Sequence, residues 1–390
     1  MTVLEPISWA LAAVVAYTFL GYPLAIRMLA WLSPNTIRRS GRFDGSFSIV
    51  VSAHNEERDV RRRLVELTAL ARVGRPLDSI ILVSDGSTDL TATQARTVGG
   101  VTVIELPVRR GKAMALNAAA AASNADVLIF GDVRQHWAAD AVERLLENFS
   151  DPRIGGVSGD LELEARGNGT IRGFGLYWRF EKWLRCQESL FHSSVGVTGA
   201  ISGVRRVLFP VLPEGTVLDD VYWPMVVVAK GYRVVHDARA VAFDSSPPRV
   251  IDEFRRKVRT LAGNYQLLRL LPGLLLPWRN PLWLQFASHK VSRLAAPWML
   301  LSLLSLTGLL VHIPYQRAAF VMQMVGYLYA CLALEPRLGR RLPFGETAAS
   351  FVVANVAAFI AFWVWLLGGT AGVWRKVSYA PVGNTLAPHR

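Results

Sequence analysis

The fold is decided by the stretch Phe47-Ser-Ile-Val-Val-Ser-Ala53, a short β-rich run followed at once by polar residues. Residues 56–72 then carry apolar side chains at helical spacing, which predicts a strand followed by a helix. The same alternation repeats, with further strands expected at 79–84, 101–106 and 126–130 and helices from 87, over 111–123 and over 138–149. Strands alternating with helices predict an α/β fold with a mainly parallel, doubly wound sheet.

Four polar loops follow the four expected strands, at Ala53–Glu56, Ser84–Ser87, Arg109–Lys112 and Gly131–Arg134. In sheets of this class, ligands bind at the carboxyl ends of the strands. No Gly-x-Gly-x-x-Gly motif follows the first strand, and the chain has no Walker A motif. Polar and acidic groups in the first two loops and basic groups in the third suit a nucleotide whose phosphates meet cations.

Hydrophobicity and charge are segregated along the 390 residues, of which 52% are hydrophobic. Four runs lack charged residues, namely Pro6–Ile26, Leu294–Gln316, Ala318–Leu334 and Thr347–Trp374. Because about 20 apolar residues cross a bilayer as a helix, these runs predict about four transmembrane helices around one large water-facing domain. The two cysteines, Cys186 and Cys331, exclude a disulfide scaffold.

The basic residues that follow the first run predict the orientation of the chain. The run lacks a basic leader, so a retained anchor is favoured over a cleaved signal. Arg27, Arg38, Arg39 and Arg42 come next, and the positive-inside rule then places the domain in the cytoplasm of a multi-pass membrane protein. The side on which the last span ends stays open. The net charge of +13 lies largely in membrane-proximal segments, which indicates anionic lipid and nucleotide phosphates rather than nucleic acid.

Two segments outside the spans combine aromatic and basic residues. Arg166–Gln187 reads as an amphipathic helix, either on the membrane surface or packed on the sheet with a solvated basic face. Tyr265–Ser292 is similar but is interrupted by prolines. These features predict five parts: an anchor at 1–33, the α/β domain at 44–260, an interfacial segment at 261–293, transmembrane helices at 294–374 and a tail at 375–390.

The order of these motifs resembles the membrane-integrated family 2 glycosyltransferases of the GT-A fold, which include bacterial cellulose, hyaluronan and poly-N-acetylglucosamine synthases. The resemblance covers about Ser48–Gln266 and the flanking spans. Val51–Glu57 is similar to the family's first nucleotide-binding loop, and the resemblance implies that Ala53, Asn55 and Glu56 bind the nucleotide sugar. Asp85 matches an aspartate that contacts the nucleotide. Lys112 lies in a segment similar to Gly-Lys-x-x-Ala-Leu-Asn and is expected beside the phosphates.

Gly131-Asp-Val-Arg134 stands where the family has its Asp-x-Asp metal motif. That pair holds Mg²⁺ or Mn²⁺ against the diphosphate, an oxygen-rich site for a hard cation. The resemblance therefore implies a divalent metal on Asp132. The second carboxylate is replaced by Arg134, so two alternatives remain: Arg134 itself neutralises phosphate charge, or Asp132 holds the metal with other groups.

Leu218-Asp219-Asp220 resembles the stretch whose last carboxylate is the catalytic base. Inversion at an anomeric carbon needs a base that removes the proton of the acceptor hydroxyl. Asp220 is the expected base, and Asp219 is expected to position the acceptor or the base. Two adjacent carboxylates can raise one another's pKa. Gly199 lies where the family builds the floor of its acceptor site.

Arg256-Lys-Val-Arg-Thr260 aligns with the family's Gln-x-x-Arg-Trp motif. Arg259 is retained, and both Arg256 and Arg259 are expected at the leaving diphosphate, which a fork of N–H donors suits. Thr260 replaces the tryptophan that lines the acceptor site of processive synthases. Trp223 or Tyr265 is the expected substitute surface for stacking.

The resemblance implies an inverting transferase that moves a sugar from a UDP-sugar, of UDP-N-acetylglucosamine or UDP-glucose type, to a growing polysaccharide or a lipid-linked acceptor at the cytoplasmic face. Membrane lipids and polysaccharide-export proteins are the further partners it implies. Two alternatives stay open: transfer of a single sugar to a membrane lipid, favoured by Thr260, and a catalytically silent membrane scaffold of the same fold, favoured by Arg134.

Overall fold

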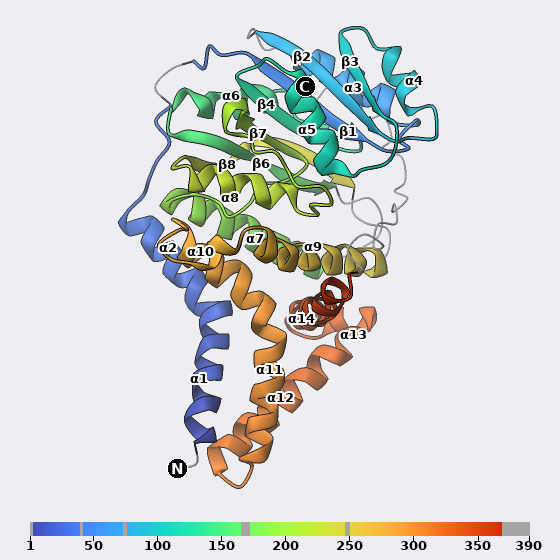
Figure 1. Cartoon of the computed structure of the whole chain (residues 1–390). Helices are drawn as coiled ribbons and strands as arrows, with labels where there is room; N and C mark the ends of the chain where they lie inside the picture. Colours follow the sequence, from blue (N-terminus) through green and yellow to red (C-terminus); the bar gives the residue numbers. More distant parts are fainter. Residues whose placement is uncertain (1–2, 40–41, 73–75, 165–171, 246–249, 369–390) are drawn as a thin grey trace.

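The computed structural model describes residues 3–39, 42–72, 76–164, 172–245 and 250–368 (Figure 1). The strands run over Phe47–Ala53 (β1), Leu77–Asp85 (β2), Val101–Leu106 (β3), Val127–Asp132 (β4), His136–Trp137 (β5), Ile154–Glu164 (β6), Ile201–Arg205 (β7) and Arg233–Ser245 (β8). The helices of the sheet domain are Val60–Leu70 (α3), Thr91–Arg96 (α4), Lys112–Ala122 (α5), Ala141–Glu147 (α6) and Asp219–Ala229 (α8). The remaining helices are Leu4–Ala16 (α1), Tyr22–Leu32 (α2), Arg172–Phe191 (α7), Val250–Leu270 (α9), Trp283–Phe286 (α10), Ser292–Leu309 (α11), Pro314–Leu332 (α12), Pro336–Arg341 (α13) and Gly345–Leu366 (α14).

All described strands belong to one sheet, in the order β3-β2-β1-β4-β7-β6-β8-β5. Strands β3, β2, β1 and β4 are parallel, as the alternation of strands and helices predicted. Beyond β4 the sheet is mixed, because β7 pairs antiparallel with both β4 and β6. In the parallel half, Ala53 pairs with Ser84 and Ser52 with Asp132, so the carboxyl ends of β1, β2 and β4 meet at one edge.

Alternate residues of the parallel strands face two separate apolar cores. Ile49, Val51 and Ile80 pack with α3, α4 and α6 on one face of the sheet. Val50 and Ile81 pack with α5 and α8 on the other face. Successive side chains of a strand point to opposite faces, so strands that are apolar throughout need helices on both sides. The sheet therefore holds its polar strand ends between two filled layers.

The helices α1, α11, α12 and α14 carry the apolar runs and are called the membrane-facing helices. They extend from the sheet domain on the side of α7 and α9 (Figure 1). Among the residues that the structure describes, three stretches are long and apolar enough to cross a membrane, at Leu4–Leu32, Trp283–Leu309 and Gly345–Leu366. About four were expected, and the remaining run, 318–334, lies in α12. Because α12 also carries Gln316, Arg317 and Gln323, it is less apolar than the other three.

Helices α7 and α9 separate the sheet from the membrane-facing helices (Figure 1). Helix α14 packs along α9 and also contacts α7, so the last apolar run is joined to the layer below the sheet. Helix α9 runs across the boundary expected at 260–261, so no change of secondary structure marks that position. The tail expected at 375–390 lies outside the described residues.

Candidate active site

A pair of opposite charges lies where the ends of β4 and α5 meet. Asp132 is the last residue of β4, and Lys112 is the first residue of α5. The Lys112 ammonium donates a hydrogen bond to Asp132 Oδ1 at 2.8 Å, and the two side chains are 23% and 32% exposed. Both residues expected at the diphosphate are thus together and accessible. Burial works against charging Lys112, but Asp132 and Asp219 raise its pKa above the usual range.

Asp85 lies next to this pair, at the end of β2, with a different set of partners. Its Oδ1 accepts a hydrogen bond from the backbone N–H of Arg110 at 2.7 Å, and its Oδ2 accepts one from Gly111 at 2.8 Å. Gly111 has a φ of +90°, a conformation that a residue without Cβ adopts at little cost. Asp85 therefore holds the turn that leads into α5 and so fixes the position of Lys112. Its predicted contact with the nucleotide stays a prediction.

Arg134 lies two residues after the end of β4 and pairs with a carboxylate of strand β8. Its Nη2 lies 3.0 Å from Asp244 Oδ2, and Asp244 is nearly buried on β8. Gln135 donates to the same oxygen at 3.1 Å. The Arg134 side chain is 36% exposed and so also faces solvent.

These residues do not fit the divalent-metal site that the resemblance implies. Its first carboxylate, Asp132, has one oxygen bonded to the Lys112 ammonium, and a guanidinium stands in place of the second carboxylate. A hard divalent cation needs several oxygen ligands. Among the described residues, no group of three or more His, Cys, Asp or Glu side chains is placed to hold a metal ion.

Asp219 and Asp220 are the first two residues of helix α8, which brings Asp219 close to Lys112. Asp219 Oδ2 lies 4.0 Å from Lys112 Nζ. Asp220 Oδ1 is buried and has no hydrogen-bond partner among the residues that the structure describes. The Asp220 carbonyl accepts a hydrogen bond from Val197 N–H at 2.9 Å, which ties the start of α8 to the segment before β7.

Burial raises the pKa of both carboxyl groups of this pair. The cations Lys112, Lys290, Arg185 and Arg259 act in the opposite direction on the pKa of Asp220 without cancelling the effect of burial. Desolvation disfavours the charged form of an acid, so a buried carboxyl binds its proton more tightly than one in water. The site therefore contains a carboxyl suited to accept a proton.

Arg259 of α9 is influenced electrostatically by the same carboxylates. Burial lowers the pKa of this guanidinium, whereas Asp220 and Asp219 raise it. Arg134 is also near enough to act on it electrostatically. Arg256, one turn earlier, makes a two-pronged ion pair with Glu253 at 2.9 and 3.0 Å. The structure thus brings Arg259 to the carboxylates and gives Arg256 a partner on its own helix.

The first loop is joined to the second loop and to the start of α4 by hydrogen bonds between backbone N–H groups and side-chain oxygens. Ala53 is buried at the end of β1. The Asn55 N–H donates to Ser87 Oγ at 3.1 Å, and its side-chain oxygen accepts from Thr88 N–H at 2.9 Å. The Glu56 N–H donates to Thr91 Oγ1 at 2.7 Å. These contacts fix the two loops against each other at the strand ends, and binding of the nucleotide by the three residues stays a prediction.

The three residues expected at the acceptor have different surroundings. A Cβ added to Gly199 would lie 3.4 Å from Lys112 Nζ, so this glycine borders the charged site. Trp223 is only 1% exposed, with its ring 6.3 Å from that of Phe130 in the core, so its prediction as a stacking surface is wrong. Tyr265 stacks on Trp365 of α14, and its hydroxyl donates to the Leu294 carbonyl. Tyr265 therefore joins α9 to the membrane-facing helices.

Arg63 was not predicted from the sequence, although it contacts the backbone of the site residue Asp132. This arginine of α3 is fully buried, and its Nε donates to the Asp132 carbonyl at 3.2 Å. Its guanidinium lies 4.5 Å from the centre of the Trp137 ring and pairs with Glu66. Arg63 lies on the same helix face as Val60, Leu64 and Leu67, and a charged residue on an apolar face was the available signal.

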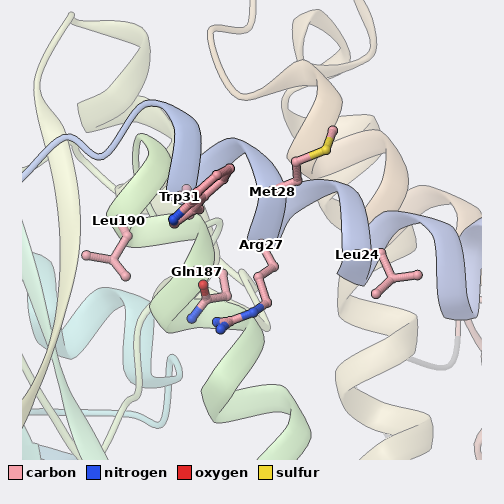
Figure 2. Close-up of a pocket in the computed structure, with 7 residues that line it drawn as sticks. Leu24, Arg27, Met28, Trp31, Gln187 and Leu190 are labelled. Carbon is pink, nitrogen blue, oxygen red and sulfur yellow. The ribbon is translucent and has the colours of Figure 1, made fainter.

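A groove of about 610 Å³ lies elsewhere, between α2 and α7 (Figure 2). Leu24, Met28 and Trp31 from α2 line it together with Gln187 and Leu190 from α7. Figure 2 shows the Arg27 side chain directed toward Gln187. The site carboxylates are not among its lining residues, so the groove is separate from the charged site around Lys112.

Comparison with known proteins gives these observations a family context. Residues 48–212 match the family model described as glycosyl transferase family 2. The chain is 24% identical over 236 residues to poly-beta-1,6-N-acetyl-D-glucosamine synthase of Staphylococcus aureus strain COL, and the same holds for strain MSSA476. The match covers 57% of this chain and 55% of each relative, so it spans about half of those proteins.

The fold is also similar to that of a solved enzyme. A mannosyltransferase from Pyrobaculum calidifontis, in complex with GDP-Man and Mn²⁺, superposes with a TM-score of 0.66 at 21% identity, over 92% of this chain and 99% of that one. The likeness extends over the sheet and the membrane-facing helices. Residues 48–212 therefore match a glycosyl transferase family 2 domain, and the fold of the chain is of the GT-A type.

Proposed function

We propose that this chain is an inverting glycosyltransferase that moves a sugar from a UDP-sugar, of UDP-N-acetylglucosamine or UDP-glucose type, to a growing polysaccharide or a lipid-linked acceptor. The observation that carries the proposal is the arrangement around Lys112. Asp132 pairs with it, Asp219 lies 4.0 Å from its ammonium, and Asp220 beside Asp219 has a buried carboxylate oxygen with no partner among the described residues. Such a site can bind a diphosphate at the Lys112 cation and accept a proton at the neighbouring Asp220 carboxylate. The family 2 domain and the similarity to a polysaccharide synthase support this reading.

In the proposed reaction, Asp220 removes the proton of the acceptor hydroxyl while its oxygen attacks the anomeric carbon from the face opposite the leaving group. The bond from that carbon to the oxygen of the β-phosphate breaks, and the nucleoside diphosphate leaves with the electron pair. Preorganised cations stabilise charge that develops in a transition state. Lys112 and Arg259 are the groups assigned to the leaving diphosphate, and Asp219 positions Asp220 or the acceptor.

One observation favours an acceptor carried by a lipid. The cations that act on Asp220 include Arg185 of α7 and Lys290, which belongs to the stretch Trp283–Leu309 that is apolar enough to cross a membrane. The proposed base is therefore next to the membrane-facing layer, where a lipid-linked hydroxyl would arrive. With the basic residues after the first apolar run, this supports a domain on the cytoplasmic face.

The proposal is tested with the full chain purified in detergent and a panel of sugar nucleotides that includes UDP-N-acetylglucosamine, UDP-glucose and GDP-mannose. We expect nucleotide release from one UDP-sugar, dependent on added membrane lipid or glycan, and labelled sugar in the product. Product length on a gel separates polymer synthesis from single-sugar transfer. Lack of release with every donor, from protein that is folded, would favour a silent scaffold and contradict the proposal.

A further inference from the structure

In this chain an arginine, Arg134, stands in place of the second carboxylate of the expected metal motif, so the charge of its side chains differs. Two carboxylates and one divalent cation sum to zero net charge, and so do Asp132 and Arg134 without any metal. The replacement therefore keeps the net charge of the metal-bound motif while it removes one of its two carboxylate ligands. A guanidinium offers N–H donors in a fork that matches phosphate oxygens, so it can contact a diphosphate directly, as a bound metal would.

The geometry around Asp132 fits that exchange. The Lys112 ammonium donates a hydrogen bond to Asp132 Oδ1 at 2.8 Å, so one oxygen of this carboxylate already has a cation as its partner. Arg134 is held by buried Asp244 at 3.0 Å, so its guanidinium is oriented by a partner outside the cleft.

The positions of the cations also fit a bound diphosphate. Lys112 and Arg134 are 23% and 36% exposed, so each can reach a ligand from where it stands. Gly199 lies directly beside Lys112, since an added Cβ would be in contact with its ammonium at 3.4 Å. The charges of Asp220, Asp219 and Arg134 also influence the pKa of Arg259, so this third cation belongs to the same charged region.

We propose that Lys112 and Arg134 together take the place of the divalent cation, so that nucleotide binding and sugar transfer by this chain need no divalent metal. The inference rests on the proposed function and names the groups that hold its donor. Asp244 is the positioning residue: it orients Arg134 and does not contact the substrate.

The test compares the full chain in detergent with excess EDTA and with Mn²⁺ or Mg²⁺. UDP binding by calorimetry and UDP release from the active donor are both measured. We expect the affinity in EDTA to be within about threefold of that with metal, a difference of less than 1 kcal/mol. Binding and release that require metal overturn the inference but leave the proposed function standing. Absence of both under every condition overturns the two together.

A second arm restores the carboxylate pair. In the double variant Arg134→Asp/Asp244→Asn, the second carboxylate returns and the carboxylate left behind is neutralised. We expect UDP affinity in EDTA to fall about tenfold or more and Mn²⁺ to recover part of it, because two carboxylates repel a diphosphate unless a cation lies between them. A variant that binds UDP like the wild type in EDTA overturns the role of Arg134.

Two further variants separate charge from folding. Arg134→Gln keeps a donor for Asp244 but carries no charge, and it should weaken UDP binding without any rescue by Mn²⁺. Arg96→Asp is the matched control, since Arg96 pairs with Glu105 on the exposed side of β3, and its affinity should be that of the wild type under both conditions. Thermal unfolding of each variant identifies any that fails to fold.

Discussion

Asp132 and Asp220 both act electrostatically on Lys112, yet their surroundings move their pKa values in opposite directions. Asp132 is paired with Lys112 and lies near Arg134, and its pKa is lowered. Asp220 has a buried oxygen with no described partner, and its pKa is raised although Lys112 and other cations oppose the effect of burial. One carboxylate is therefore held charged and the other is prepared to take a proton. The comparison divides the cleft into a phosphate side and a proton-transfer side.

The strongest way to break this comparison is to remove the proposed base. Asp220→Asn should lower the rate of sugar transfer about a thousandfold, the usual contribution of a general base, while UDP affinity stays within a few fold. Transfer is measured as UDP release with saturating donor and acceptor. Asp140→Asn, an exposed partner of Arg144, is the control and should transfer at the wild-type rate. Near-normal transfer by the Asp220 variant would remove that residue from the mechanism.

The next change acts on the phosphate side. Lys112→Gln removes the cation bonded to Asp132 and should weaken UDP binding about tenfold to a hundredfold, as expected for a hydrogen bond to a charged group. Calorimetric titration with UDP checks the result. Arg96→Gln is the matched loss of one exposed cation and should leave the affinity unchanged. If the Lys112 variant binds UDP normally and loses only the rate of transfer, the two sides of the cleft have been assigned wrongly.

The pH dependence of transfer should sharpen the comparison. Asp220 must be deprotonated to act as a base, so transfer is lost as pH falls through its pKa. Because that pKa is raised, the acid limb should lie above pH ~4, the usual range of a carboxyl group. Asp219→Asn should move the limb to lower pH, since a neighbouring negative charge disfavours ionisation. An acid limb near pH ~4 in the wild type would contradict the assignment.

The smallest effect on transfer is expected from Trp223. Trp223→Phe should lower the free energy of unfolding by about 1–3 kcal/mol, because a smaller ring leaves a gap in a packed core, and should leave the transfer rate per folded molecule unchanged. Denaturant unfolding and product-length analysis check the two parts. Shorter products from a variant of unchanged stability would return Trp223 to the acceptor site.

The parallel half of the sheet could be predicted because its signals are local. The run from Phe47 to Ala53 and the helix after it alternate in a pattern that neighbouring residues determine. Strands β6, β7 and β8 could not be predicted in the same way. Their pairing joins segments far apart in the chain, as Val157 and Gly203 are joined, and periodicity carries no information about such partners.

The candidate site was also predicted only where local motifs place its residues, and its partners from distant strands were not predicted. Lys112, Asp132, Asp219 and Asp220 were expected together from the strand ends and the order of motifs, and the structure brings them together. The Asp244 partner of Arg134 comes from a strand that the sequence did not reveal. Trp223 lies in the apolar run that continues to Val228, which favours the core over a ligand surface.

The central claim is that one cleft holds a diphosphate against Lys112 and Arg134 and a hydroxyl against Asp220. Its most direct test is an experimental structure of the full chain with the intact UDP-sugar bound in the presence of EDTA. The account predicts β-phosphate oxygens within hydrogen-bond distance of Lys112 Nζ and Arg134, with the anomeric carbon facing Asp220. A diphosphate bound away from both cations, or a sugar on the far side of α8 from Asp220, would contradict it.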